Sequence, residues 1–346
     1  MKLIIQIPCY NEETTLPEVI RDLPRVLPGI DEIEYLVIDD GSIDNTVNVA
    51  RSLGVHHIHS LGNNKGLSTA FKEGIDKCLD LGADIIVNTD GDNQYDAGYI
   101  KDLVAPIIEG RMDIVIGTRP LDEIENYSKV KNLLQRLGSR VVRHFSGTDI
   151  PDTTSGFRAY SAEAALRLQV FNKYTYTLET IIQSGHMNMR IGHVPIQVNG
   201  KMRESRLISS IPSYIWQSGL IILRSYITYK PLRTFFYCAI LPALVGLAIC
   251  LRFMYYYLFD SGSGHIQSLI LAAILLIISF LMIMLGILAD LISTNRRLIQ
   301  ESIFVQRKQI YDSRKSKCEN NDISKHQYSE FSMTGQPSFK RANQAN

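Results

Sequence analysis

The chain has 346 residues, 45% of them hydrophobic, and a formal net charge of +1. This apolar share supports one large domain or two smaller ones and excludes a largely disordered chain, while the near-neutral charge argues against a nucleic-acid-binding protein. The 5 cysteines are scattered without Cys-x-x-Cys spacing, so neither a disulfide framework nor a structural zinc site is expected. The opening apolar run, 3–7, is too short for a signal peptide and is interpreted as a first strand made in a reducing cytoplasm.

Strand-like apolar runs alternate with segments of helical periodicity from residue 3 to about residue 118. In chain order the expected elements are strand 3–7, helix 15–27, strand 35–38, helix 45–53, helix 67–81, strand 85–87, helix 99–109 and strand 114–116. Such alternation predicts an α/β domain with a mostly parallel sheet.

Polar side chains follow four of these strands at their carboxyl ends, in the segments 8–12, 39–42, 90–92 and 117–119. In an open α/β sheet, ligands bind beyond the carboxyl ends of the strands, so we expect these segments to form one site. The chain has no Gly-x-Gly-x-x-Gly fingerprint and no Walker-type loop. Side chains and a metal ion would therefore have to hold a nucleotide here.

The segment Thr89-Asp90-Gly91-Asp92 carries the strongest chemical signal. Along an extended chain, side chains at i and i+2 point the same way, so Asp90 and Asp92 can face one divalent cation, with Gln94 as a third oxygen donor. Mg²⁺ and Mn²⁺ prefer all-oxygen ligands and complete their coordination with substrate phosphates. The alternative is an ordinary turn, because Asp-Gly pairs commonly form turns.

Two amphipathic stretches come next. The segment 129–145 alternates basic and apolar residues and is either an ordinary solvated helix or a helix that meets a lipid phosphate. The segment 205–231 contains Trp216, the only tryptophan of the chain, and leads directly into a long apolar run. We expect this second stretch to lie at a membrane interface.

The segments 232–259 and 266–289 are each long enough to cross the ~30 Å hydrocarbon layer of a bilayer, so they are expected to form a transmembrane hairpin. Basic residues flank its outer ends: Lys230, Arg233, Arg296 and Arg297. The connecting segment 260–265 has no Lys or Arg, so the positive-inside rule places both termini and the first domain in the cytoplasm. Arg252, late in the first span, is expected to reach the outer interface.

Taken in this order, the motifs resemble those of the family 2 glycosyltransferases of the GT-A fold, most closely the polyprenyl-phosphate glycosyltransferases typified by dolichol-phosphate mannosyltransferase. The resemblance covers about residues 3–301 and includes an Asp-x-x-Ser-Gly-Phe pattern over 152–157. It implies four regions along the chain: a cytoplasmic GT-A (Rossmann-like) catalytic domain over 1–204, amphipathic interface helices over 205–231, a transmembrane hairpin over 232–289, and a cytoplasmic juxtamembrane helix with a disordered tail over 290–346.

The resemblance also implies roles for particular residues. The nucleotide sugar would be bound by residues at the strand ends and by one later arginine: Pro8, Tyr10, Asn11, Glu12, Asp39, Asp40, Asp90, Gly91, Asp92, Gln94, Arg119 and Arg203. Of the two aspartates after the second strand, Asp40 is the expected nucleotide contact. Asp90, Asp92 and Gln94 would hold the metal. Asp90, Asp92 and Arg119 would be catalytic, because a cation and an arginine stabilise charge on a departing diphosphate. The acceptor phosphate would be aligned by five residues: Lys131, Arg136, Arg140, Ser205 and Arg206.

The activity that the resemblance implies is transfer of a sugar from a UDP- or GDP-sugar to dolichyl or undecaprenyl phosphate, with Mg²⁺ or Mn²⁺ and inversion at the anomeric carbon. A phosphate acceptor is already anionic, so no general base is required. One alternative is a hydroxyl acceptor, which would need Asp152 or Glu179 as a base. Another is a non-catalytic membrane adaptor that only binds a nucleotide sugar. No nucleic-acid partner is expected, and a homo-oligomer is left open.

Overall fold

The computed structural model describes residues 1–119, 139–140, 142–143, 146–171, 175–199, 219–220, 223–224, 226–259 and 266–334, with side chains as far as residue 316. Its centre is a seven-stranded sheet. In spatial order the strands are β3 (His57–Ser60), β2 (Glu32–Asp39), β1 (Lys2–Cys9), β4 (Ile85–Asn88), β6 (Arg158–Ser161), β5 (Ile114–Thr118) and β7 (Ile191–Pro195). All neighbours pair in parallel except β6, which is antiparallel to both β4 and β5. The predicted α/β class with a mostly parallel sheet is confirmed.

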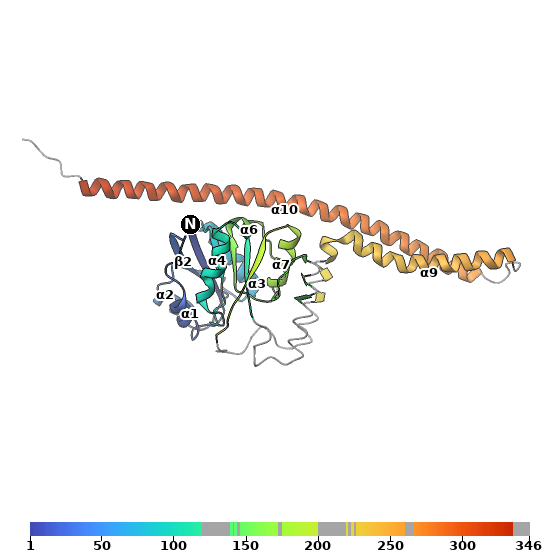
Figure 1. Ribbon diagram of the computed structural model, residues 1–346, viewed down its shortest axis with the longest axis horizontal. Coiled ribbons are helices and arrows are strands. Elements are labelled where there is room, and N and C mark those ends of the chain that lie inside the picture. Colours follow the sequence, from blue (N-terminus) through green and yellow to red (C-terminus); the bar gives the residue numbers. More distant parts are fainter. Residues whose placement is uncertain are drawn as a thin grey trace, which may run out of the picture.

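Helices cover both faces of the sheet (Figure 1). In chain order they are α1 (Leu16–Asp22), α2 (Thr46–Ser52), α3 (Leu67–Asp80), the short 3-10 helix η1 (Ala97–Tyr99), α4 (Ile100–Ile108), α6 (Ala162–Arg167) and α7 (Thr177–His186). Successive residues of a strand point to opposite faces, and β1 follows this rule. Ile4 packs with α3, α6 and α7 on one face, whereas Leu3 and Ile5 pack with α1 and α4 on the other.

Helix α3 lies unusually close to β1, and a glycine allows it. A Cβ at Gly74 would lie 2.2 Å from Oε1 of Gln6 and 3.0 Å from Cγ1 of Ile38. Gln6 is fully buried, and its Nε2 donates a hydrogen bond to Oδ1 of Asn88 at 2.9 Å. The glycine therefore leaves room for a buried polar pair that joins the middle of β1 to the end of β4.

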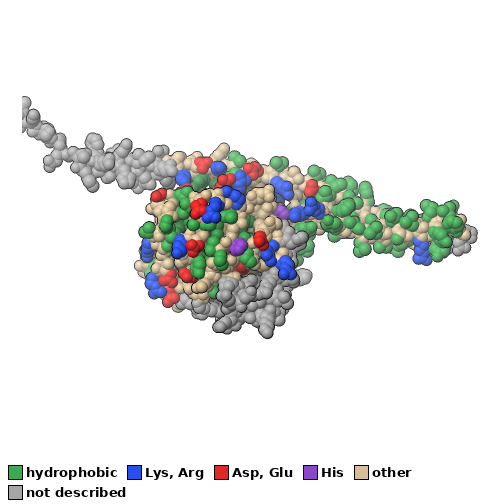
Figure 2. Space-filling view, in the orientation of Figure 1, with side chains coloured by type: hydrophobic (Ala, Val, Ile, Leu, Met, Phe, Trp, Pro, Cys, Tyr) green, Lys and Arg blue, Asp and Glu red, His purple; other side chains and the backbone are tan. Residues whose placement is uncertain are grey.

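Two long helices follow the α/β domain: α9 (Pro231–Phe259) and α10 (Ile266–Thr334). By length and composition, both are able to cross a membrane. They pack side by side as the predicted hairpin, with the Ser279 hydroxyl donating to the Ala239 carbonyl at 3.0 Å and Gly246 lying against Leu276. Their large apolar side chains face outward (Figure 2), as expected for a surface that meets lipid.

Helix α10 continues far beyond the apolar segment, which corrects one expectation. We expected the chain to lose regular structure after residue 311, but the helix runs on to Thr334. The physical reason is that no Gly or Pro interrupts the chain between Gly286 and Gly335. Of the expected interface segment 205–231, Trp216 and most neighbouring residues lie outside the described part, and residues 226–229 are helical.

Replacing Gly74 with alanine is expected to lower the free energy of unfolding of the catalytic domain by about 1–3 kcal/mol, because the new methyl group overpacks the contact with Gln6. Chemical unfolding followed by circular dichroism measures the change. Gly219→Ala is the matched control, since nothing lies within 4 Å of the position of its Cβ. Equal stability of the two variants would contradict this account of the packing.

Candidate active site

The loop that leaves β4 presents alternate side chains to the surface. Asp90, Asp92 and Gln94 are partly exposed, whereas the residues between them are buried. All three oxygen-bearing side chains are therefore accessible, but the segment is a turn at residues 91–92 and not the extended chain on which the spacing argument rested. The loop bends at Asn93, whose φ of 53° is in the left-handed region, and the backbone N–H of Gln94 donates to Oδ1 of Asp92 at 3.2 Å.

The end of β1 supports this loop from behind. The hydroxyl of Thr15 donates to the carbonyl of Gly91 at 2.7 Å and to Oε2 of Glu12 at 2.8 Å. A Cβ at Gly91 would lie 3.1 Å from Sγ of Cys9 and 3.3 Å from Cγ of Glu12, so only glycine fits here without a shift. Burial raises the pKa of the Cys9 thiol well above its ordinary value. Glu12 thus supports the acidic loop from a buried position.

The turn after β1 also joins the turn after β2. Asn11 has a left-handed φ of 56°, its N–H donates to the Ser42 hydroxyl at 2.9 Å, and its Oδ1 accepts from the N–H of Ile43 at 2.8 Å. Pro8 is buried at the end of β1, and Tyr10 is partly exposed beside Asn11. These contacts fix the position of the Pro8–Tyr10 segment at the edge of the sheet.

The two aspartates at the end of β2 connect neighbouring segments at this edge of the sheet. Asp39 accepts hydrogen bonds from the N–H of Ser42 at 2.9 Å and from the hydroxyl of Ser60, the last residue of β3, at 2.7 Å. Asp40 accepts from the backbone N–H groups of residues 65–66, in the loop that follows β3, at 2.7 and 2.9 Å. Burial raises the pKa of Asp40, although these two hydrogen bonds oppose the shift. Asp39 therefore joins the turn after β2 to the end of β3, and Asp40 holds the loop after β3 beside the predicted nucleotide site.

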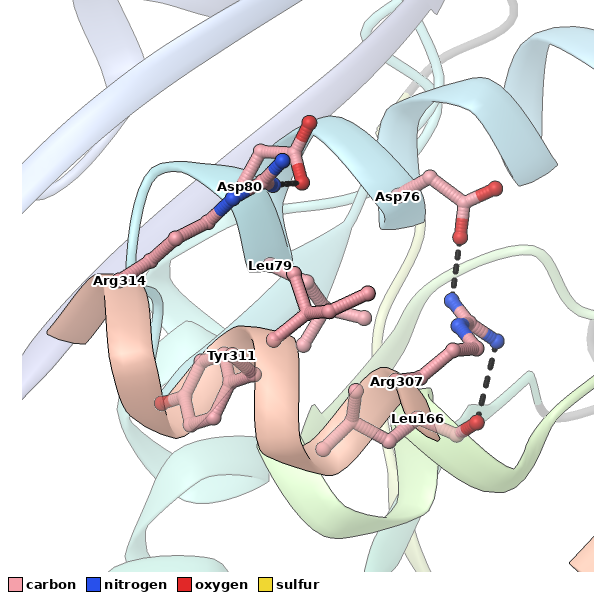
Figure 3. Close-up of a pocket in the computed structure, with 8 residues that line it drawn as sticks. Asp76, Leu79, Asp80, Leu166, Arg307, Tyr311 and Arg314 are labelled. Atoms are coloured by element: carbon pink, nitrogen blue, oxygen red, sulfur yellow. Dashed lines mark hydrogen bonds and ion pairs between the residues drawn. The ribbon is translucent and has the colours of Figure 1, made fainter. Parts of the chain in front are cut away.

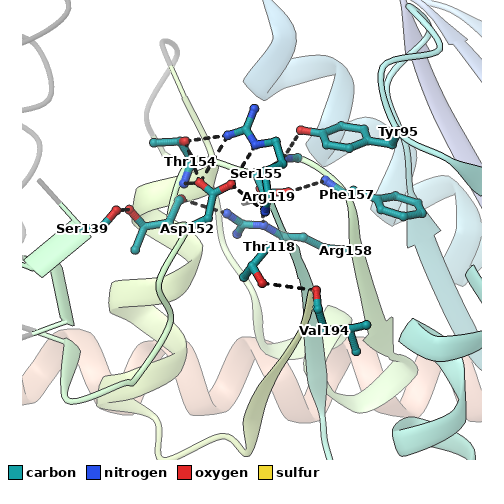
Figure 4. A network of polar contacts seen from close by, with 12 residues as sticks. Tyr95, Thr118, Arg119, Ser139, Asp152, Thr154, Ser155, Phe157, Arg158 and Val194 are labelled. Atoms are coloured by element: carbon teal, nitrogen blue, oxygen red, sulfur yellow. Dashed lines mark hydrogen bonds and ion pairs between the residues drawn. The ribbon is translucent and has the colours of Figure 1, made fainter. Parts of the chain in front are cut away.

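A buried ion pair lies at the end of β5 (Figure 4). The guanidinium of Arg119 donates to both oxygens of Asp152, at 2.7 and 3.2 Å, and to the hydroxyl of Thr154 at 2.9 Å. The side chains are only 9% and 1% exposed, respectively. Burial alone would raise the pKa of Asp152, but the charge of Arg119 and the hydrogen bonds from Arg119 and Thr154 hold it below its ordinary value. Asp152 is therefore a weak proton acceptor.

The loop 152–157 is held by a second, fully buried arginine. Arg158 donates to the carbonyls of Thr153, Ser155 and Thr177 at 2.8–3.1 Å and to the hydroxyl of Thr180 at 2.8 Å. The sequence analysis did not select Arg158, because an arginine inside a short strand gives no signal that it is buried. Its hydrogen bonds fix the backbone around the Arg119–Asp152 pair.

Gly156 brings this loop against the acidic loop. Its N–H donates to the Tyr95 hydroxyl at 3.1 Å, and its carbonyl accepts from Nδ2 of Asn88 at 2.8 Å. A Cβ at Gly156 would lie 3.1 Å from Oδ1 of Asp90 and 2.9 Å from the Tyr176 hydroxyl. Burial raises the pKa of Tyr95 to about 12, with smaller opposite effects from Arg119 and Asp90. Both charged groups thus act on one hydroxyl, so the two loops form one site.

Of the predicted acceptor-phosphate residues, only Arg140 lies in the described part of the chain. Arg140 is exposed, and the neighbouring Ser139 lies within 3.2 Å of the Thr153 hydroxyl, which brings this segment next to the loop 152–157. Five predicted residues lie outside the described part of the chain: Lys131, Arg136, Arg203, Ser205 and Arg206. Glu179, one of the two candidate bases, accepts a hydrogen bond from the N–H of Phe171 at 3.1 Å.

The acidic loop suits a hard cation. Within the described residues, no group of three or more His, Cys, Asp or Glu side chains comes together in a metal-binding arrangement. Asp90 and Asp92 offer two partly exposed carboxylates, and Gln94 offers a partly exposed amide oxygen in the same loop. A site with few protein ligands suits Mg²⁺ or Mn²⁺, because these ions keep positions for waters and substrate phosphates.

Residues 4–168 match the family model described as glycosyl transferase family 2. A UDP-N-acetylglucosamine–dolichyl-phosphate N-acetylglucosaminyltransferase of Methanococcus voltae is 30% identical over 55% of this chain and 83% of that protein. An undecaprenyl-phosphate mannosyltransferase of Micrococcus luteus is 28% identical over 61% of this chain and 89% of that protein. The fold is similar to glucosyl-3-phosphoglycerate synthase of Mycobacterium tuberculosis, solved with Mn²⁺ and UDP, with a TM-score of 0.52 and 18% identity over 66% of this chain and 79% of that one.

Asp152→Asn is expected to lower the free energy of unfolding at pH 7 by about 3–5 kcal/mol, because it leaves the buried Arg119 without its carboxylate. The pKa of Asp152 is lower in the folded state than the value of about 3.9 in an unfolded chain. Its contribution is therefore present above about pH 4 and is lost as the pH falls through the folded pKa. Unfolding measured against pH should show the difference between wild type and variant shrinking below about pH 4.

Asp149→Asn is the matched control for this prediction. Its partner is Arg143 at 3.2 Å, but the Asp149 side chain is 95% exposed. Removal of this surface pair is expected to change stability by at most about 1 kcal/mol. Equal effects of the two substitutions would mean that the Arg119–Asp152 pair is not a buried interaction.

Proposed function

Because the chain belongs to the family 2 glycosyltransferases with a GT-A fold, we propose that it transfers a sugar from a nucleoside diphosphate sugar to a polyprenyl phosphate in the membrane. The observation that carries this proposal is the contact between Asp90 in the acidic loop and Gly156 in the loop 152–157, whose Asp152 binds Arg119. An anion-stabilising arginine and two accessible carboxylates meet at one edge of the sheet, and an apolar hairpin follows the same domain.

In the proposed donor complex, Asp90, Asp92 and Gln94 bind Mg²⁺ or Mn²⁺, and the metal supplies charge neutralisation at the diphosphate. The nucleoside end lies between the turns after β1 and β2, over Tyr10, Asn11 and the Asp39–Asp40 pair. The relatives act on dolichyl or undecaprenyl phosphate by name, and the similar structure was solved with UDP and Mn²⁺. These names support both the metal and the lipid phosphate acceptor.

Arg119 stabilises the leaving group in this proposal. An oxygen of the polyprenyl phosphate forms a bond to the anomeric carbon, and the bond between that carbon and the diphosphate oxygen breaks. The nucleoside diphosphate leaves with the electron pair, and direct attack inverts the anomeric centre. Asp152 and Thr154 fix the guanidinium before substrate arrives, so little reorganisation is needed when negative charge develops.

The state of Asp152 favours a phosphate acceptor over a hydroxyl acceptor that would use this residue as its base. The pKa of Asp152 is lowered, and its two oxygens bind Arg119. A carboxylate stabilised in this way accepts protons poorly near neutral pH. The presence of the Arg119–Asp152 pair in a loop that packs against Asp90 also argues against a non-catalytic adaptor.

The proposed membrane arrangement follows from the flanking charges. The hairpin of α9 and α10 spans the bilayer, and the catalytic domain and both termini lie in the cytoplasm. Arg252 lies 5.7 Å from the centre of the Tyr256 ring, which suits an anchor at the outer interface. Lys131, Arg136, Arg140, Ser205 and Arg206 are the proposed acceptor-phosphate contacts.

Asp92→Ala is expected to reduce turnover by at least about 100-fold, because it removes a ligand of the ion that stabilises the leaving group. The assay measures nucleoside diphosphate release and the mass of the lipid product, with polyprenyl phosphate and a panel of nucleotide sugars. Raising Mn²⁺ should not restore the rate. Asp102→Ala, at an exposed position on α4, is the control and should be unaffected. A fully active Asp92→Ala enzyme would refute the metal assignment.

Gly156→Ala is expected to raise the Mn²⁺ concentration needed for half-maximal turnover about tenfold or more, because its methyl group would displace the Asp90 carboxylate. A titration of activity against Mn²⁺ checks this shift, with Gly219→Ala as the control. An unchanged Mn²⁺ requirement would mean that the position of Asp90 does not govern metal binding.

A further inference from the structure

The cytoplasmic half of α10, residues 293–334, presents one stripe of residues to the catalytic domain. Gln300, Phe304 and Tyr311 are buried, and the polar contacts of the helix come from Arg307, Arg314 and Lys315. From Gln300 to Arg314 these positions are spaced by alternating steps of four and three residues, and Lys315 lies four residues after Tyr311, so they share one face of the helix. Figure 1 shows this part of α10 running along the whole domain.

Two aromatic residues of this stripe are part of the core of the domain. Phe304 and Tyr311 belong to the same buried cluster as Phe71 on α3. The guanidinium of Arg167 lies 3.7 Å from the centre of the Phe304 ring, and the Tyr311 hydroxyl donates to the carbonyl of Ala83 at 3.1 Å. Burial of a phenylalanine side chain contributes about 1.5–3 kcal/mol, so these residues bind α10 firmly.

Ion pairs set the register of the helix on the domain (Figure 3). Three of them join α10 to α3 and the turn after it: Arg307 with Asp76, Arg314 with Asp80, and Lys315 with Asp84. Arg307 also donates to the carbonyls of Leu166 and Leu168 at 3.0 and 3.3 Å. Half-exposed pairs contribute little energy each, but together they select one register of the helix.

The contacts of Tyr311 and Lys315 on α10 with Ala83 and Asp84 lie at the opposite end of β4 from the active site. Ala83 and Asp84 immediately precede β4, and the acidic loop with Asp90 follows it. The strand has 4 residues, which span about 13 Å at 3.3 Å each. One short, buried strand therefore separates the contacts of α10 with Ala83 and Asp84 from the acidic loop.

The same helix reaches the membrane hairpin without a break. The Ser293 hydroxyl donates to the carbonyl of Thr228, just before α9, at 2.9 Å. Arg296 lies between the rings of Tyr229 and Phe171, 5.2 and 5.5 Å from their centres. The stretch from Ser293 to Tyr311 has no Gly or Pro and spans about 27 Å of continuous helix.

We propose that the cytoplasmic half of α10 is a positioning element of the reaction, which holds the active site at a fixed height and tilt above the inner leaflet. This inference depends on the proposed function, because only an acceptor confined to the bilayer needs such a fixed site. A flexible tether would leave the domain free to rotate away from the acceptor phosphate. A stiff helix whose side chains pack into the core of the domain removes that freedom.

The test is a flexible Gly-Gly-Ser-Gly-Gly-Ser insertion between Thr294 and Asn295 in the full chain. It leaves the stripe from Gln300 to Lys315 docked but separates it from the membrane span. With long-chain polyprenyl phosphate in bilayers, kcat/KM should fall on the order of 10- to 100-fold. With a short-chain, water-soluble polyprenyl phosphate, kcat/KM should stay within about twofold, because the site itself is intact. The same insertion after Thr334 is the control.

The kcat/KM values with the two acceptors distinguish a positioning role of α10 from damage to the domain and from failure of the proposed function. Equal kcat/KM values for wild type and insertion variant with both acceptors would overturn the proposal, and so would a parallel loss with both, which indicates damage to the domain. If wild type transfers no sugar to either acceptor, the proposed function itself fails. A second variant tests the docking contact: Arg314→Asp should reproduce the selective loss, and adding Asp80→Arg should restore activity with the long-chain acceptor. Failure of that restoration would show that the pair does not set the register.

Discussion

The active site depends on one close contact, in which the carboxylate of Asp90 lies against the bare Cα of Gly156. The contact exists because β6 lies between β4 and β5 and runs in the opposite direction to both of them. Asn88 at the end of β4 pairs with Arg158 at the start of β6. The loop that enters β6 therefore reaches the same edge as the loops that leave β4 and β5. If β6 were parallel, its entry loop would lie at the far edge of the sheet. A single reversed strand thus brings the Asp152 loop to both Arg119 and the acidic pair.

Buried polar groups hold this arrangement in place. Arg158 is fully buried, and its described hydrogen-bond acceptors are backbone carbonyls and a threonine hydroxyl. Gln6 and Asn88 form a second buried chain that ends at the Gly156 carbonyl. A buried charge or amide is costly unless its hydrogen bonds are made, so the loops have few alternative conformations. The site is therefore largely organised before a substrate arrives, which is the condition under which fixed charges stabilise a transition state well.

The sequence predicted those parts of the fold that rest on hydrophobic periodicity. β1, β2, β4 and β5 were expected because their apolar runs are strong. Asp90, Asp92 and Gln94 were expected to follow strand geometry, but β4 ends at Asn88 and the chain turns at residues 91–92, a bend that apolar periodicity does not predict. The short strands β3, β6 and β7 were not predicted, because His57–Ser60 and Arg158–Ser161 are short and polar, and the burial of their side chains is set by distant neighbours. The pairing of Arg119 with Asp152 was not predicted either, because the two residues are 33 positions apart and the fold alone brings them together.

The place of Phe304 and Tyr311 in the core has a consequence for biogenesis. Both residues are translated after the two apolar segments 232–259 and 266–289, so the α/β domain is synthesised with part of its hydrophobic cluster still missing. The cluster can be completed only once both apolar segments have been made.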